Sequence, residues 1–184
     1  MTSLTDAQRK AFFPGSFDPF TRGHESIVRR ALALFSHVVV GIGINPDKKG
    51  VMSTELRRQL IEAVFDGDDR VSVVSYSGLT VDAVKAAGAC CIVRGVRNVD
   101  DFDYELKIAD FNRNIAGIDT LFLPALSPLA DISSTALRQK IARGGNVSGM
   151  LPSRCPQHIV DELRSLCADE LSNICIEIEK RLFD

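Results

Sequence analysis

The segment "PGSFDPFTRGH", residues 14–24, follows an apolar run that ends in Phe12 and Phe13. It contains two prolines and two glycines, and it closes on a histidine where an amphipathic stretch begins. Turn residues at this density end a strand, and an amphipathic stretch after them indicates a helix. The segment therefore connects a first strand to a first helix, and it carries more small and hydroxyl side chains than a plain surface loop needs.

Short apolar runs alternate with longer amphipathic stretches along the rest of the chain. The predicted strands are residues 10–13, 37–44, 71–76, 90–94 and 119–124. The predicted helices are residues 23–35, 53–65, 80–87, 99–115, 133–143 and 156–182. This alternation is typical of parallel sheets with helical crossovers, and continuous apolar strands suit a sheet covered on both faces. We predict a doubly wound, Rossmann-like α/β fold with a five-stranded parallel sheet, helices on both faces and a C-terminal helical tail.

Size and composition favour one globular domain. The chain has 184 residues, 45% of them hydrophobic, which is enough for a full core. We expect a single domain over residues 1–184, with a core of about residues 10–152 and a C-terminal helical segment of about residues 153–184.

Charge and hydropathy exclude some partners. The formal net charge is -2 and no basic run is present, whereas a protein held by nucleic-acid phosphates carries clustered Lys and Arg. No apolar stretch reaches the roughly 18 residues of a membrane span, and "MTSLTDAQRK" lacks the apolar core of a secretory signal. We therefore predict no nucleic-acid partner, no membrane partner and a cytoplasmic location.

The five cysteines form no C-x-x-C pair and are odd in number, so the sequence predicts neither a structural zinc site nor a disulfide framework. We expect reduced thiols. The cysteines are Cys90, Cys91, Cys155, Cys167 and Cys175.

Residues that follow the predicted strands share one chemical theme. In an open parallel sheet, ligands bind beyond the carboxyl ends of the strands. The residues there are glycines, hydroxyls, one histidine and several cations, which is what phosphate groups require. Neither a Walker A sequence nor G-x-G-x-x-G is present, so the phosphates must be held in another way.

Four segments carry a family resemblance. Thr21-Arg22-Gly23-His24 resembles the T/H-x-G-H signature of the nucleotidyltransferase superfamily, and "ISSTALR", residues 132–138, resembles its second signature. "PDKKG", residues 46–50, and "RGVRNVDDFDYE", residues 94–105, occur in the matching order and spacing. From about residue 11 to about residue 165, the chain resembles the bacterial phosphopantetheine adenylyltransferases of that superfamily.

The resemblance implies transfer of the adenylyl group of ATP to 4'-phosphopantetheine, which gives dephospho-coenzyme A and pyrophosphate in the penultimate step of coenzyme A synthesis. It also implies Mg²⁺ carried with ATP, no protein metal ligands, coenzyme A as a further possible ligand and a homohexamer. The acceptor phosphate is already an anion at neutral pH, so catalysis reduces to positioning and charge stabilisation.

The resemblance also implies residue roles. His24 would stabilise the transition state, with Lys48 and Arg97 as further catalytic residues. The acceptor would be held by Ser16, Lys48, Thr80 and Arg94. The implied ATP-binding residues are Ser16, Phe17, His24, Gly95, Val96, Arg97, Glu105, Leu129, Ala130, Asp131, Ile132, Ser133, Ser134 and Thr135.

Three positions depart from the family pattern. Leu129 stands where many relatives carry an aromatic residue, which puts an aromatic contact to the nucleotide in doubt. Arg138 stands where the family often has Lys, and Ser16 replaces the commoner Thr but keeps the hydroxyl.

Two alternatives remain open. The first is another adenylyl- or cytidylyltransferase, acting on nicotinate mononucleotide or glycerol phosphate, although those relatives usually carry histidine where this chain has Thr21. The second is a nucleotide-binding regulatory protein without catalysis, for which a histidine at the reacting phosphate would be unnecessary. Taken singly, His24 could be an ordinary helix-start residue and Lys48 a solvated lysine, whereas His37 and His158 are expected to be structural or exposed.

Overall fold

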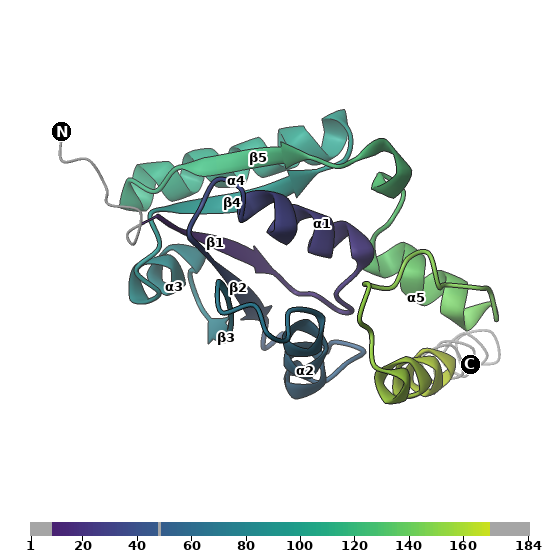
Figure 1. Ribbon diagram of the computed structural model, residues 1–184. Helices are drawn as coiled ribbons and strands as arrows, with labels where there is room; N and C mark the ends of the chain where they lie inside the picture. Colours follow the sequence, from purple (N-terminus) through teal and green to yellow (C-terminus); the bar gives the residue numbers. More distant parts are fainter. Residues whose placement is uncertain (1–8, 48, 170–184) are drawn as a thin grey trace.

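The computed structural model of the protein describes residues 9–47 and 49–169 (Figure 1). Its centre is one parallel sheet in the strand order β3-β2-β1-β4-β5. The strands are β1 (Lys10–Gly15), β2 (His37–Ile44), β3 (Val71–Ser77), β4 (Cys91–Val96) and β5 (Thr120–Pro124). The predicted five-stranded parallel sheet is confirmed. The chain moves outward from β1 to β3 and then returns to β4 beside β1, which creates a topological switch point between β1 and β4.

The predicted helices are present with small shifts at their ends. They are α1 (Arg22–Ala31), α2 (Thr54–Val64), α3 (Thr80–Ala86), α4 (Val99–Ala116) and α5 (Ser134–Ala142), with a short 3₁₀ helix η2 (Ser127–Leu129) before α5. A final helix begins at residue 157 and is described to residue 169, so the rest of the predicted 156–182 helix lies outside the described residues. The predicted 23–35 helix is too long: α1 ends at Ala31, since the chain must turn to enter β2 at His37.

Helices cover both faces of the sheet. Residues at alternating positions of each strand point to opposite faces. Phe13 and Val40 belong to a large core formed with α1, α2, α5 and the final helix. Phe12 and Val39 belong to a smaller core with α3 and the end of α4. Because both faces are covered, β1 and β2 in the middle of the sheet are mostly buried apolar runs, whereas the edge strand β3 contains three serines and is partly exposed.

Helix α4 is unlike the others because most of its apolar side chains are exposed. Its buried residues are Glu105 and Asn112, both polar. The exposed apolar residues of α4 are Val99, Phe102, Tyr104, Leu106, Ile108, Phe111 and Ile115. The Phe102 ring packs edge-on against Phe122 of β5, with ring centroids 5.2 Å apart, but much apolar surface of α4 stays exposed among the described residues.

Across residues 9–47 and 49–169, no helix is both long and apolar enough to cross a membrane. Four cysteines within these residues are free thiols, and Cys175 lies outside them. Burial raises the pKa of the Cys91 thiol to about 12 and that of Cys155 to about 11, so both are inert at neutral pH.

Candidate active site

A cavity of about 300 Å³ opens at the carboxyl ends of β1, β4 and β5. Its walls come from the β1–α1 loop, the end of β4, helix α4 and the turn before α5. Segments from the beginning, middle and later part of the described chain therefore meet at the sheet's switch point. The polar lining residues are Ser16, His24, Arg94, Arg97, Asp101, Glu105, Ser133, Ser134 and Thr135.

The loop after β1 is held from α5. The Ser134 hydroxyl donates to the Pro19 carbonyl at 2.8 Å, and Arg138 Nη1 donates to the Asp18 carbonyl at 2.6 Å. Phe17 has a φ of 48°, in the left-handed region that non-glycine residues rarely adopt. These two hydrogen bonds to backbone carbonyls hold the turn in its strained conformation. Arg138 does not line the cavity, so its role here is structural.

His24 is fixed by the start of α1. Thr21 is the N-cap, and its hydroxyl accepts from the His24 backbone N–H at 3.4 Å. In return, the Thr21 backbone N–H donates to His24 Nδ1 at 3.0 Å. This reciprocal pair is a capping box in which histidine takes the place of the usual Glu or Gln. Because Nδ1 accepts a hydrogen bond, the neutral ring carries its proton on Nε2, which has no hydrogen-bond partner among the described residues.

The His24 ring is held neutral by its surroundings. It lies among Phe17 and Phe20, with ring centroids 5.2 Å and 5.4 Å away, and it lines the cavity. Burial, and then the positive charges of Arg94 and Arg97, lower the pKa of His24 to about 3. At neutral pH the side chain is therefore a neutral N–H donor and has no proton to give as an acid.

Arg94 forms a wall of the cavity together with Glu105. Its Nε donates to Glu105 Oε2 at 2.8 Å, and its Nη2 donates to the other carboxylate oxygen. Its Nη1 donates to the Pro14 carbonyl. These contacts hold the guanidinium flat between β1 and α4, and a planar fork held in this way is suited to an anion.

Arg97 has a similar partner. Its Nε and Nη2 donate to Asp101 at 3.2 Å and 3.1 Å, and its backbone N–H donates to the same carboxylate. The Asp101 hydrogen bond raises the pKa of Arg97, and the hydrogen bonds and charge of Arg97 hold the pKa of Asp101 below its usual value despite partial burial. Each arginine that lines the cavity therefore forms an ion pair with one carboxylate, so the positive charge of the site is partly neutralised.

The three hydroxyls before and at the start of α5 have different tasks. Ser133 is the N-cap, and its Oγ accepts from the Ala136 N–H at 3.1 Å, which leaves its O–H free to donate. The Ser134 O–H is engaged with Pro19, so Ser134 can only accept from a ligand in this conformation. Thr135 is exposed at the rim. The first-turn N–H groups of α5 add donors for an anion.

A second cavity of about 620 Å³ lies between β1, β2, β3, β4 and α4. It shares Pro14, Gly15, Ser16, Arg94 and Glu105 with the first cavity. The Ser16 loop and the Arg94–Glu105 pair are therefore the common wall of two adjoining spaces.

Several polar side chains line the second cavity. The Tyr76 and Thr80 hydroxyls are 3.0 Å apart and bond to each other. Asn112 is 6% exposed, and its side-chain amide has no hydrogen-bond partner within residues 9–47 and 49–169. The Thr120 hydroxyl is buried and also without a partner there. Buried polar groups are normally satisfied, so the Thr120 hydroxyl indicates a ligand with hydrogen-bonding capacity, and the Asn112 amide beside the cavity could bind the same ligand.

Most predicted site residues come together at these two cavities. Thr80 lies in the second cavity, apart from His24. Val96, Ala130 and Asp131 do not line either cavity, so the structure does not bring them to the site. Lys48 lies outside the described residues.

Sequence reasoning missed Asp101, Tyr76, Asn112 and Thr120. Asp101 is four residues after Arg97, a helical ion-pair spacing that could have revealed it. Asn112 is a polar residue in the middle of a helical stretch, but only the tertiary fold shows which face of α4 turns inward.

Among the described residues, no group of three or more His, Cys, Asp or Glu side chains could hold a metal ion. The carboxylates that line the first cavity, Asp101 and Glu105, are engaged by arginines.

Solved structures share this architecture. A bifunctional NMN adenylyltransferase/ADP ribose pyrophosphatase from Francisella tularensis superposes with a TM-score of 0.67 at 21% identity, over 95% of this chain and 56% of that one. A putative nicotinate-nucleotide adenylyltransferase from Vibrio parahaemolyticus gives a TM-score of 0.60 at 20% identity, over 86% of this chain and 94% of that one. The present chain thus spans just over half of the bifunctional protein. These two likenesses show that the chain has the fold of those proteins.

The family is shown by sequence. The cytidylyltransferase-like family model matches residues 12–140. Proteins named phosphopantetheine adenylyltransferase are 50% identical over 144 residues in Phocaeicola vulgatus and 47% identical over 142 residues in Porphyromonas gingivalis. These matches cover 78% and 77% of this chain and 95% and 93% of the relatives. The chain belongs to the cytidylyltransferase-like family and, within it, to the phosphopantetheine adenylyltransferases.

Proposed function

We propose that the protein transfers the adenylyl group of ATP to 4'-phosphopantetheine, giving dephospho-coenzyme A and pyrophosphate. One observation carries this proposal: two adjoining cavities share Ser16, Arg94 and Glu105 as their common wall, and His24 lines the first cavity. Two phosphorylated reactants held on opposite sides of such a wall would meet at the Arg94 guanidinium. The family membership supports the same pair of substrates.

The reaction needs no general base. The acceptor phosphate is an anion at neutral pH, and its oxygen attacks the α-phosphorus of ATP while the bond to the β-phosphate oxygen breaks. Charge grows on the α-phosphate oxygens as the reaction proceeds. The Nε2–H of His24 is the donor for that charge, because the ring is neutral and its orientation is fixed by Thr21.

The arginines are held ready for phosphate. A guanidinium has five N–H donors, and Arg94 uses three of them on Glu105 and Pro14. Two donors remain for the acceptor phosphate. Arg97 and the free O–H of Ser133 face the same cavity and would take the ATP phosphates. Preorganised donors of this kind cost no rearrangement during the reaction.

The second cavity suits the pantetheine arm, which alternates amides and hydroxyls with methylene groups. Asn112 and Thr120 supply unpartnered polar groups, and Tyr104 and Ile108 supply apolar surface. Lys48 remains a predicted ligand of the acceptor phosphate.

ATP enters as its magnesium complex. Since Asp101 and Glu105 are paired with arginines, the ion would be held by the phosphate oxygens of the substrate. We expect the enzyme to work in the cytoplasm, where ATP is plentiful.

The test is pyrophosphate release from MgATP with a panel of acceptors: 4'-phosphopantetheine, nicotinate mononucleotide and glycerol phosphate. Of the three acceptors, we expect only 4'-phosphopantetheine to give pyrophosphate release. Mass spectrometry should identify the second product as dephospho-coenzyme A. Release with another acceptor in preference would assign a different transferase activity. ATP binding without release for any acceptor would favour a regulatory protein.

We also propose that the protein forms homohexamers. The exposed apolar side chains of α4 support contacts between copies of the chain. Phe102 and Phe111 are 41% and 53% exposed, and Ile115 is 46% exposed. Large apolar patches on a chain of this size mark interaction surfaces. Light scattering coupled to size exclusion should give six times the chain mass of 20.1 kDa, and Phe111→Glu should reduce it. A monomer at all concentrations would contradict the assembly.

A further inference from the structure

We propose that Arg57 is a positioning residue, which acts with the buried carboxylate of Asp18 to fix the Ser16 loop for the acceptor phosphate. The inference rests on the function proposed above. It concerns a pair of buried charges that the chemistry of the reaction does not use.

The two side chains are buried together beside the site. Asp18 is 7% exposed and Arg57 is 8% exposed, and Arg57 Nε lies 3.7 Å from Asp18 Oδ1. Neither residue lines either cavity, so neither can contact a substrate held there. Burying an ion pair removes two charges from water and is often no more stabilising than an apolar pair. The arrangement therefore calls for a reason besides stability.

Asp18 joins two loops that meet at the carboxyl edge of the sheet. Its carboxylate oxygens accept from the backbone N–H groups of Val51 at 2.8 Å and Met52 at 2.9 Å. Asp18 belongs to the loop after β1, and the two donors belong to the loop before α2. Both carboxylate oxygens are thus used to hold one loop against the other.

Arg57 completes the connection from α2. Its Nε and Nη2 donate to the Met52 carbonyl at 2.9 Å and 2.6 Å, and its Nη1 donates to the Ser16 carbonyl at 3.1 Å. Ser16 lines both cavities. One rigid guanidinium therefore sets the distance between α2 and the peptide of a residue predicted to hold the acceptor phosphate. A lysine lacks the planar fork with which Arg57 places separate nitrogens on the two carbonyls.

Gly50 allows this pair to be moved without removing a charge. A Cβ at position 50 would lie 1.9 Å from Arg57 Nη2 and 2.9 Å from Asp18 Oδ2. Gly50→Ala must therefore displace the guanidinium. Gly149 is a matched control, because a Cβ there would meet nothing within 4 Å.

The experiment compares wild type with Arg57→Met, Arg57→Lys, Gly50→Ala and Gly149→Ala. It measures kcat, the KM for each substrate and the thermal midpoint. A loop displaced by about 1 Å should raise the KM for 4'-phosphopantetheine about 10-fold and lower kcat about 10-fold in the first three variants. The KM for ATP should change less than about 3-fold, because its phosphates also contact donors outside the loop. Gly149→Ala should match wild type.

A lower thermal midpoint with unchanged kcat and KM in the folded protein would overturn the proposal, since the pair would then be only structural. If Arg57→Met fails to fold, Arg57→Lys and Gly50→Ala decide the matter by the same criteria. If wild type and Gly149→Ala also release no pyrophosphate, the proposed function itself fails and this inference fails with it. The inference is supported if wild type and Gly149→Ala are active and the other variants alone show the lower kcat and the higher KM for 4'-phosphopantetheine.

Discussion

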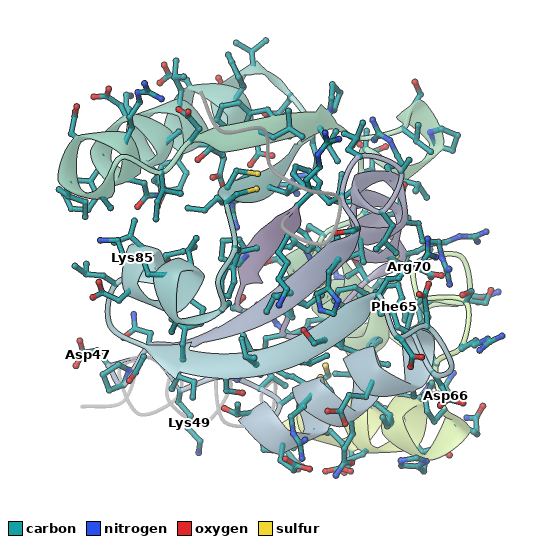
Figure 2. The ribbon with its side chains drawn as sticks, turned by 60° about the vertical axis from the view of Figure 1, so that its left-hand side comes forward. Asp47, Lys49, Phe65, Asp66, Arg70 and Lys85 are labelled. Atoms are coloured by element: carbon teal, nitrogen blue, oxygen red, sulfur yellow. The ribbon has the colours of Figure 1, made fainter. Side chains whose placement is uncertain are left out.

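The two ends of the parallel sheet carry similar residue types in different surroundings. Each end has a histidine and an arginine paired with a carboxylate: His24 and Arg94 at the carboxyl end, His37 and Arg70 at the amino end. Figure 2 shows Asp47 and Lys49, which follow β2, on the opposite side of the molecule from Arg70, which precedes β3.

The surroundings separate these residues. His37 Nε2 bonds the Ser72 hydroxyl at 2.8 Å across neighbouring strands, and the Arg70–Asp68 pair joins residues two apart in an exposed turn. At the carboxyl end, the Arg94–Glu105 pair is largely buried, and both residues line two cavities. A histidine and a paired arginine therefore indicate a functional site only where the fold brings them together at a cavity, and residue type by itself does not.

His24 should show the largest contrast. His24→Ala removes the Nε2–H donor, so we expect kcat to fall by about 100-fold or more with a much smaller change in the KM for ATP. His37→Ala should change kcat less than about 2-fold because nothing at the amino end reaches the substrates. Steady-state kinetics on both variants measures this. Equal losses in kcat and ATP affinity for His24→Ala would contradict a transition-state role.

Arg94 should come next. Arg94→Met removes a two-pronged phosphate contact and leaves Glu105 buried without its partner, so kcat/KM for the acceptor should fall by at least about 10-fold. Arg70→Met breaks an exposed pair, which contributes little to stability and nothing to the site. Initial rates with limiting acceptor compare the two variants. A similar loss in both would remove the distinction between the ends of the sheet.

The sheet and its helices were predictable because their signals are local. The run at β2 is mostly buried and rich in valine and isoleucine, and the alternation of strand and helix patterns is visible along the chain. Strand ends moved by one or two residues: β1 runs on to Gly15, because the ladder with β2 continues to that residue. The sequence pattern does not encode where a ladder stops.

The site was predictable in part. The resemblance named His24, Arg94 and Ser133, which the fold brings to one cavity. It could not show that Glu105 pairs with Arg94, since that pair joins β4 to α4 and forms only in the tertiary fold. Nor could it show that Asn112 faces inward, because α4 reverses the usual apolar-inside pattern.

Helix caps offer a smaller contrast between a cap in the site and one outside it. Thr21 caps α1 beside the reacting histidine, and Ser53 caps α2 with its hydroxyl accepting from Leu56 N–H at 3.1 Å. Thr21→Val and Ser53→Ala should each lower stability by about 1 kcal/mol. Only Thr21→Val should also lower kcat, by about 5-fold, because His24 loses part of its support. Thermal unfolding and kinetics on the same preparations test this, and equal kcat values would contradict the cap's catalytic part.

The smallest expected effect is on stability as a function of pH. The unfolded chain binds a proton at His24 near pH 6.5, whereas the folded protein does so only near the lowered pKa of about 3. Between these values the unfolded state holds more protons, so stability is full above pH 6.5 and is lost as the pH falls. His24→Gln removes this linkage. From pH 7 to pH 5, the variant's free energy of unfolding should therefore fall by about 1 kcal/mol less than that of wild type, after allowance for partial exposure of the ring. Urea titrations at the two pH values measure the difference.

His37→Gln serves as the comparison at the other end of the sheet. Burial and Lys10 lower the pKa of His37 as well, so its contribution to stability is also lost as the pH falls. A His24→Gln curve parallel to that of wild type would mean that the pKa of His24 is the same in the folded and unfolded protein, which would contradict the lowered pKa.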